Sequence, residues 1–187
     1  MTSLLLLNKN KMNKQIKYKT EDIEKFLKES NAIEQEFSVI ALKDALKAWD
    51  YLKTKSFLTL EVILGVHHLL ARHIDPDIAG QWRNCDVWIG GHKKTFVSVQ
   101  LIEEDIASAI SSMEMNDKLP TDDLEEFTKQ SHIEFEEIHP FQDGNGRTGR
   151  LIYLWHRMKL GLPIHIIHAD WDKGGNEQKN YYSWFKK

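Results

Sequence analysis

The stretch HPFQDGNGRTGR, His139 to Arg150, brings a histidine, a carboxylate, three glycines and two arginines into twelve residues. It lies between two segments with helical apolar spacing, a Glu-rich one that ends near Ile138 and an apolar one, Thr148 to Leu160. Glycines before a helix let main-chain N–H groups converge, and the helix dipole adds positive charge at that end. The stretch therefore predicts an anion site suited to phosphate.

The side chains of this stretch indicate what the anion site does. Arg147 and Arg150 are three residues apart, so they share one helix face and can both bind phosphate oxygens. Asp143 is an oxygen ligand of the kind that binds Mg²⁺ together with phosphates. His139 precedes a rigid proline and can take a proton from an attacking hydroxyl. The set indicates phosphoryl or nucleotidyl transfer, and it matches neither a Walker A loop nor a Rossmann fingerprint.

Apolar residues recur at spacings of three and four along most of the chain, which predicts an all-α domain. The expected helices are Glu21 to Leu27, Ile33 to Leu52, Thr59 to His73, Ile102 to Met115, Leu124 to Ile138 and Thr148 to Leu160. One region differs, because Cys85 to Ile89 and Thr95 to Val99 are rich in β-branched and aromatic residues. With Gly90 to Lys94 as a loop, they predict a β-hairpin.

Length and composition limit the class of protein. A chain of 187 residues, 41% hydrophobic and 28% charged, fits one domain with one core. A net charge of −3 argues against a nucleic-acid partner. The run Leu4 to Leu7 is too short for a membrane span and lacks the flanks of a signal peptide. We therefore expect a cytoplasmic protein without membrane contact, with residues 1–18 as a mobile tail.

The stretch resembles the motif of the Fic (Fido) domain proteins, H-P-F-x-[D/E]-G-N-G-R-x-x-R. Every fixed position is filled, by His139, Pro140, Phe141, Asp143, Gly144, Asn145, Gly146, Arg147 and Arg150. Further similarity lies in Leu58 to Leu70, Gly80 to Arg83, Val87 to Gly90 and His132 to Arg150. The resemblance covers roughly residues 30–185. It implies the helical Fic fold with a small β-hairpin flap at 85–99, inside a core of residues 56–187.

The resemblance also implies an activity, the transfer of AMP from ATP to a Ser, Thr or Tyr hydroxyl of a target protein. His139 would be the general base, and Asp143 would hold the Mg²⁺ that bridges the α- and β-phosphates. The anion hole would be formed by Gly144, Asn145 and Gly146. Arg147 would bind the β-phosphate and Arg150 the γ-phosphate. These roles agree with those expected from the chemistry of the residues.

The flap gains a role from the same resemblance, since in this family it pairs with an extended target segment by β-augmentation. The docking residues would be Gly90, Gly91, His92, Lys93, Lys94, Thr95 and Phe96. Family flaps often carry prolines after the hairpin, whereas this chain has Val97-Ser98-Val99.

A second motif lies upstream, in the segment of residues 19–55 expected to hold the N-terminal helices. Ser30 to Gln35 resembles the family's inhibitory motif, [S/T]-x-x-x-E-[G/N], with Gln35 departing from its last position. The resemblance implies that Ser30 and Glu34 are inhibitory residues, Glu34 pairing with Arg150 in place of the γ-phosphate. The alternative is that Glu34 is a surface residue of an ordinary helix.

Two features outside the motifs complete the candidate residues. Tyr181 and Tyr182 resemble paired tyrosines that contact the adenine side in some relatives, although such aromatic residues are more often part of a core. His67 and His68 lie in an apolar segment and are expected to be packing residues.

Several functions remain open at this point. The leading hypothesis is an autoinhibited protein adenylyltransferase, with self-modification as an option. Alternatives are transfer of another group such as UMP or a phosphoryl group, a non-catalytic regulator that binds nucleotide and a partner protein, and removal of AMP from a target. The sequence leaves open the oligomeric state, the target, and whether the protein acts in its own cell or is delivered into another.

Overall fold

The computed structural model describes residues 18–89, 92–93, 97–114, 123–170 and 175–185. The predicted tail, residues 1–18, lies outside the described residues except for Tyr18. Tyr18 belongs to the folded part, because its hydroxyl donates a hydrogen bond to the carbonyl oxygen of Leu162.

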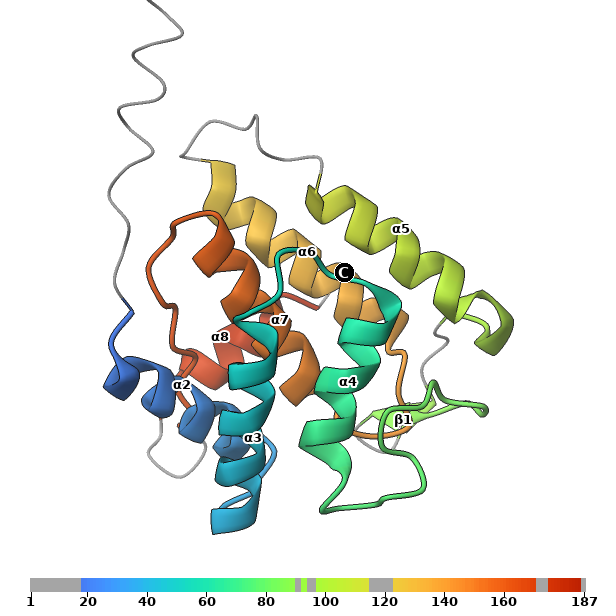
Figure 1. Ribbon diagram of the computed structural model, residues 1–187, viewed down its shortest axis with the longest axis horizontal. Coiled ribbons are helices and arrows are strands. Elements are labelled where there is room, and N and C mark those ends of the chain that lie inside the picture. The colour runs from blue at the N-terminus through green and yellow to red at the C-terminus, as the bar shows by residue number, and fades with distance from the viewer. Residues whose placement is uncertain (1–17, 90–91, 94–96, 115–122, 171–174, 186–187) are drawn as a thin grey trace, which may run out of the picture.

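The described part of the chain is a helical body, as the apolar spacing predicts (Figure 1). Its helices are α2 (Thr20–Ile33), α3 (Val39–Leu52), α4 (Leu60–Ala71), η1 (Val99–Leu101), α5 (Ile102–Glu114), α6 (Leu124–Ile138), α7 (Asn145–Lys159) and α8 (Glu177–Ser183). Helices α3 and α4 pack as neighbours, as do α5 and α6.

Helix α7 is the centre of the fold, since it packs against α2, α4 and α6. Every residue from Arg147 to Arg157 is buried. Leu151 and Leu154 meet Phe135 of α6 in the main hydrophobic core, and a smaller core joins Ile33 of α2 to Tyr181 of α8. The N-terminus of α7 is therefore held by helices that lie far apart in the sequence.

The segment between α2 and α3 differs from the prediction of one helix from Ile33 to Leu52, which is wrong. Helix α2 ends at Ile33, and α3 begins at Val39. Ser38 caps the new helix, with its hydroxyl accepting a hydrogen bond from the Ala41 N–H at 3.1 Å. Gln35 has a φ of 57°, which no continuous helix allows. Glu34 consequently lies in a turn rather than on a helix face.

Two short strands interrupt the helices. Strand β1 (Trp88–Ile89) pairs antiparallel with β2 (His92–Lys93), with Trp88 opposite Lys93 and Ile89 opposite His92. The prediction of a second strand at Thr95 to Val99 is wrong at its end, because Val99 begins the 3₁₀ helix η1. The predicted five-residue loop, Gly90 to Lys94, is wrong as well, because His92 and Lys93 form strand β2. Gly90, Gly91, Lys94, Thr95 and Phe96 lie outside the described residues.

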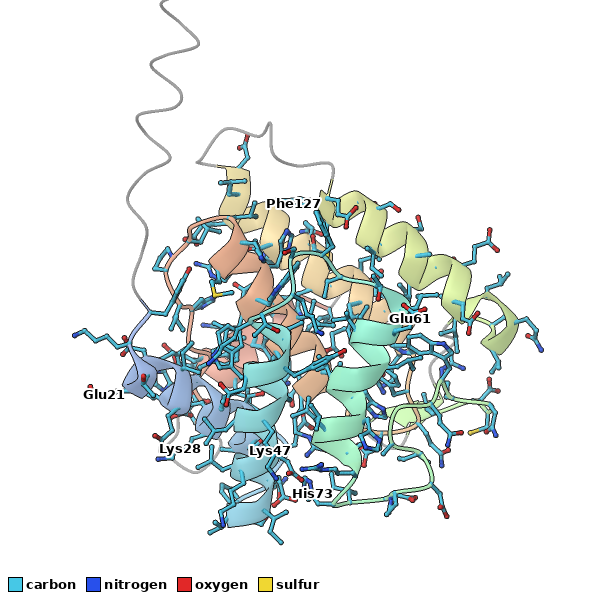
Figure 2. All side chains as sticks on the ribbon, viewed as in Figure 1. Glu21, Lys28, Lys47, Glu61, His73 and Phe127 are labelled. Atoms are coloured by element: carbon cyan, nitrogen blue, oxygen red, sulfur yellow. The ribbon has the colours of Figure 1, made fainter. Side chains whose placement is uncertain are left out.

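Figure 2 labels several charged side chains on the exterior of this body. Glu21, Lys28, Lys47 and Glu61 are all exposed. Within the described ranges, no helix combines the length and the apolar character that crossing a membrane requires.

Candidate active site

The segment from His139 to Gly144 forms the loop between α6 and α7. His139 ends α6 with left-handed backbone angles, φ 50° and ψ 62°, and Gly144 precedes α7 with a φ of 76°. The Asn145 side chain closes the loop: its Oδ1 accepts from the Phe141 N–H at 2.8 Å, and its Nδ2 donates to the Phe141 carbonyl at 2.8 Å. The Asn145 side chain thus shapes the loop, and its main-chain N–H stays available to the anion hole that the resemblance implies.

His67 of α4 contacts this loop and helps to fix its shape. Its Nδ1 accepts a hydrogen bond from the Gly80 N–H at 3.0 Å, so its Nε2 donates to the Asp143 carbonyl oxygen at 2.9 Å. Burial lowers the pKa of His67 to about 4, which keeps the ring neutral. The ring stacks on Phe141 with centroids 3.7 Å apart. The sequence predicted the packing and missed the two hydrogen bonds.

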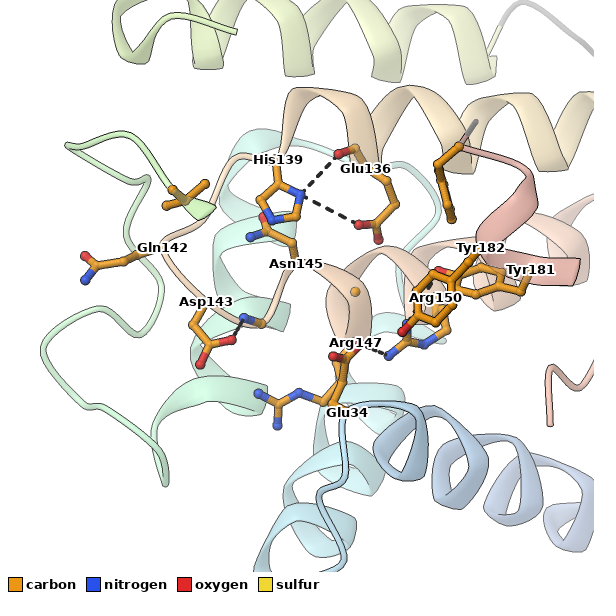
Figure 3. Close-up of a pocket in the computed structure, with 14 residues that line it drawn as sticks. Glu34, Glu136, His139, Gln142, Asp143, Asn145, Arg147, Arg150, Tyr181 and Tyr182 are labelled. Atoms are coloured by element: carbon orange, nitrogen blue, oxygen red, sulfur yellow. Dashed lines mark hydrogen bonds and ion pairs between the residues drawn. The ribbon is translucent and has the colours of Figure 1, made fainter. Parts of the chain in front are cut away.

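A cavity of about 430 Å³ opens over the loop (Figure 3). It is lined by all the predicted residues from His139 to Arg150 that the motif assigns a role, together with Glu34, Tyr181 and Tyr182. It adds Val87, Glu136, Gln142 and Phe185, which sequence reasoning had not selected. The turn after α2 and residues of α6, α7 and α8 therefore share one cavity.

His139 lies at one side of this cavity. Its Nδ1 is 3.1 Å from the Glu136 carbonyl oxygen and 3.9 Å from a Glu136 carboxylate oxygen (Figure 3). When Nδ1 donates to the Glu136 carbonyl oxygen, the accepting lone pair of the ring lies on Nε2. This tautomer suits a general base.

Arg147 lies at the opposite side and is 5% exposed. Its Nε has no hydrogen-bond partner among the described residues. Burial lowers the pKa of Arg147, while the nearby carboxylates of Asp143 and Glu34 act against that effect. A buried guanidinium with an unused donor, beside the N-terminus of α7, fits an anionic ligand.

Arg150 is 2% exposed and already holds several partners. Its Nε donates to the Ser30 hydroxyl at 2.9 Å, and its Nη2 donates to the Ser30 carbonyl at 2.9 Å. Nη2 also donates to Oε1 of Glu34 at 2.7 Å. Burial alone would lower the pKa of Arg150, but Tyr181 and Glu34 outweigh it and raise the pKa. The predicted pairing of Glu34 with Arg150 is present in the structure.

The turn after α2 explains how Glu34 reaches Arg150. Glu34 is the C-cap of α2, its side chain is 39% exposed, and Gln35 follows with a positive φ. Glycine and asparagine adopt positive φ at the lowest cost, so this position accounts for the Gly or Asn of the inhibitory motif. Gln35 adopts the same backbone without that advantage.

The two tyrosines occupy different environments. Tyr181 is buried, and its hydroxyl lies 2.9 Å from Nε2 of His132 and accepts from Nη1 of Arg150 at 3.4 Å. Tyr182 is 45% exposed and lines the cavity. The Tyr181 hydroxyl therefore belongs to the Arg150 contacts, and Tyr182 presents the accessible ring. Their contact with adenine stays a prediction.

Asp143 is the candidate metal ligand. Its Oδ1 accepts a hydrogen bond from the Gly144 N–H at 2.5 Å. The described residues contain no group of three His, Cys, Asp or Glu side chains arranged to hold a metal ion. A single carboxylate beside a phosphate site fits Mg²⁺ that binds with its nucleotide, because Mg²⁺ usually keeps water and phosphate ligands.

A helix N-terminus, two buried arginines and a histidine surround one cavity, which is the combination of groups that phosphate-binding sites use. The model of the Fic/DOC family matches residues 57–156 of the 187. The chain therefore belongs to the Fic/DOC family.

Curated relatives agree with this assignment. The protein adenylyltransferase Fic of Aedes aegypti is 28% identical over 142 residues, which are 74% of this chain and 28% of that protein. The protein of the same name from Nematostella vectensis is 30% identical over 156 residues, 80% of this chain and 33% of that protein. The chain spans about a third or less of the length of these relatives.

Solved structures share the fold. A Fic-domain-containing signalling protein from Bacteroides thetaiotaomicron has a TM-score of 0.71 at 19% identity, over 97% of this chain and 80% of that chain. Fic-1 from C. elegans has a TM-score of 0.69 at 20% identity, over 97% of this chain and 62% of that chain. The helical body described above is thus the Fic fold.

Proposed function

We propose that this chain is a protein adenylyltransferase that transfers AMP from ATP to a Ser, Thr or Tyr hydroxyl of a target protein, and that Glu34 restrains it. The observation that carries the proposal is that His139, the N-terminus of α7 and two buried arginines face one cavity. The names of the relatives, protein adenylyltransferase Fic, favour AMP over other transferred groups.

In the proposed reaction, His139 acts on the target hydroxyl from one side of the cavity, and the arginines bind the phosphates on the other side. The target hydroxyl oxygen attacks the α-phosphorus and forms a new P–O bond, while the bond to the bridging oxygen of pyrophosphate breaks. Pyrophosphate leaves with that electron pair. His139 takes the hydroxyl proton on Nε2, because its Nδ1 lies against the Glu136 carbonyl oxygen. Positioning and charge neutralisation supply most of the remaining catalysis.

The phosphates would lie over the start of α7. The N–H groups of Asn145 and Gly146 would face the α-phosphate, beside Gly144, whose own N–H donates to Asp143. Arg147 would lie at the β-phosphate and Arg150 at the γ-phosphate. The unused Nε donor of Arg147 supports this arrangement. Asp143 would hold Mg²⁺, which when bound neutralises charge on the α- and β-phosphates.

Glu34 would act as an inhibitor by competing for Arg150. Its carboxylate accepts from Nη2 at 2.7 Å, and the γ-phosphate needs the same donor. Ser30 accepts from Nε and from the same Nη2, so Arg150 would keep these two bonds when Glu34 leaves. Activation therefore requires only the Glu34 carboxylate to move.

The flap would receive the target. Strand β2 pairs with β1 on one side, and an extended target segment adding to the flap would place its hydroxyl before His139. A second copy of the chain could present such a segment as well, which would give self-modification.

The test is incorporation of AMP from Mg²⁺-ATP labelled on the α-phosphate into proteins of a cell lysate. The Glu34→Gly protein should label a target, and the Glu34→Gly, His139→Ala protein should not. No label from Glu34→Gly with either ATP or UTP would refute the proposal. Label from γ-labelled ATP would instead indicate phosphoryl transfer. Equal ATP binding without turnover in both variants would indicate a non-catalytic regulator.

A second candidate reaction is removal of AMP from a modified target. It is favoured by the Glu34 carboxylate lining the same cavity as His139, since a carboxylate can orient an attacking water. Wild-type protein incubated with AMP-modified target would release AMP if this reaction occurs, and Glu34→Gly would not.

A further inference from the structure

Arg83 has contacts that the proposed mechanism does not use. It lies in the segment between α4 and β1 and is 3% exposed. Its Nε donates to the His139 carbonyl at 2.8 Å, and its Nη1 donates to the Cys85 carbonyl at 3.2 Å. Its Nη2 donates to the Val97 carbonyl, and its main-chain N–H donates to the Pro140 carbonyl at 2.9 Å.

These acceptors belong to two parts of the site. Cys85 precedes β1 and Val97 follows β2. Nη1 and Nη2 of Arg83 therefore bind the main chain at the two ends of the flap. Nε of Arg83 binds the main-chain carbonyl of His139, whose side chain is the proposed base. One side chain thus joins the target-docking hairpin to His139.

Burying the Arg83 guanidinium costs free energy, so its retention points to a role for its geometry. Burial lowers the pKa of Arg83, with Asp86 and Cys85 acting in the opposite direction. Each hydrogen-bond acceptor that the structure gives the guanidinium is a neutral carbonyl. Taking a cation out of water is unfavourable, and hydrogen bonds to carbonyl oxygens offset only part of that cost. The planar fork of arginine can, however, bind three carbonyls in fixed directions, which a lysine ammonium does not reproduce.

The neighbouring contacts strengthen the same connection. The Trp82 ring stacks on Phe141 with centroids 5.2 Å apart, on the ring that His67 also contacts. Gly80 donates to His67, which in turn donates to the Asp143 carbonyl. The segment from Gly80 to Arg83 therefore supports the catalytic loop along its length.

We infer that Arg83 is a positioning residue that fixes the distance between a target strand on the flap and the His139 imidazole. The inference rests on the proposed adenylyl transfer. ATP binding should depend on Arg83 much less, since the arginines of the phosphate side, Arg147 and Arg150, lie on α7 and donate to none of the acceptors of Arg83 in the described part of the chain.

The activity test uses Arg83→Lys in the Glu34→Gly protein. AMP transfer to lysate proteins should fall at least about tenfold, because two or more charge-assisted hydrogen bonds are lost. The Kd of Mg²⁺-ATP, measured by calorimetry, should stay within about twofold. The matched control is Arg72→Lys, since Arg72 pairs with Asp44 away from the flap and His139. The inference would be overturned if Arg83→Lys left AMP transfer unchanged. It would also be overturned if Arg83→Lys lowered AMP transfer and ATP affinity to the same extent.

Hydrogen–deuterium exchange of the nucleotide-free proteins separates this inference from the proposed function. In Arg83→Lys, peptides containing Cys85, Val97 and His139 should all exchange roughly tenfold faster, because one side chain holds all three. Arg72→Lys should leave them unchanged. Faster exchange at the flap alone, or at none of these peptides, refutes the connection even if no variant transfers AMP. If Arg83→Lys does not fold, Arg83→Gln, which keeps one side-chain donor group, is measured in the same way.

Discussion

Replacing Glu34 by glutamine should strengthen ATP binding far more than ADP binding. The Glu34 carboxylate lies 2.7 Å from Nη2 of Arg150, so the bond is charge-assisted. Such bonds contribute about 1.5–3 kcal/mol, and the 39% exposure of the Glu34 side chain places this one near the lower end. A contribution of about 1.5–2 kcal/mol corresponds to roughly tenfold to thirtyfold in affinity.

The assay is calorimetric titration of Mg²⁺-ATP and Mg²⁺-ADP into proteins that also carry His139→Ala, which prevents turnover. The gain should be specific to ATP, because only ATP has the γ-phosphate that needs Arg150. A smaller gain for ADP is expected, since Glu34 also lies close enough to affect Arg147. Glu24→Gln is the matched control, because Glu24 pairs with Lys28 on the surface of the same helix.

Two results would refute this reasoning. Equal gains for ATP and ADP would mean that Glu34 acts through the general negative charge of the cavity. No gain for either nucleotide would mean that the pair with Arg150 does not oppose nucleotide binding.

Three further substitutions test other parts of the account. In the Glu34→Gly protein, which lacks the competing carboxylate, Gly146→Ala places a Cβ 2.9 Å from Nη1 of Arg150, so ATP affinity should fall about tenfold or more in calorimetry; unchanged affinity would show that the start of α7 has room for the methyl group. Asp143→Asn should raise the Mg²⁺ concentration for half-maximal AMP transfer by at least about tenfold, and an unchanged Mg²⁺ titration would exclude Asp143 as the ligand. Burial lowers the pKa of His156 to about 4. Below about pH 6.5 the unfolded chain therefore binds a proton that the folded chain does not, and the free energy of unfolding falls as the pH drops towards 4. His156→Phe should therefore be about 2 kcal/mol more stable relative to wild type at pH 5 than at pH 7.5 in urea unfolding, and equal differences at the two pH values would contradict this.

The parts of the site that the sequence predicts are those fixed by local spacing. Arg147 and Arg150 share a helix start, and the glycines around Asn145 mark the turn before it, so one continuous stretch reveals the anion site. The pairing of Glu34 with Arg150 spans 116 positions, and it was predicted through resemblance to the family's motif rather than from spacing.

The remaining features depend on main-chain groups that side-chain patterns do not reveal. Arg83 binds carbonyl oxygens, which every residue has, so no partner residue type marks its role. His67 likewise bonds a main-chain N–H and a carbonyl, and its apolar neighbours suggest only packing. The turn at Gln35 was missed because the apolar spacing continues across it from Ile33 into α3.

The central claim is that His139 uses ATP to modify a hydroxyl while Glu34 holds Arg150. The most direct measurement compares wild type, Glu34→Gly and Glu34→Gly, His139→Ala with ATP labelled on the α-phosphate, in one lysate and at one protein concentration. Strong label on a protein band with Glu34→Gly alone is the predicted result. Equal label with wild type would contradict the restraint by Glu34, and label that persists without His139 would contradict the mechanism.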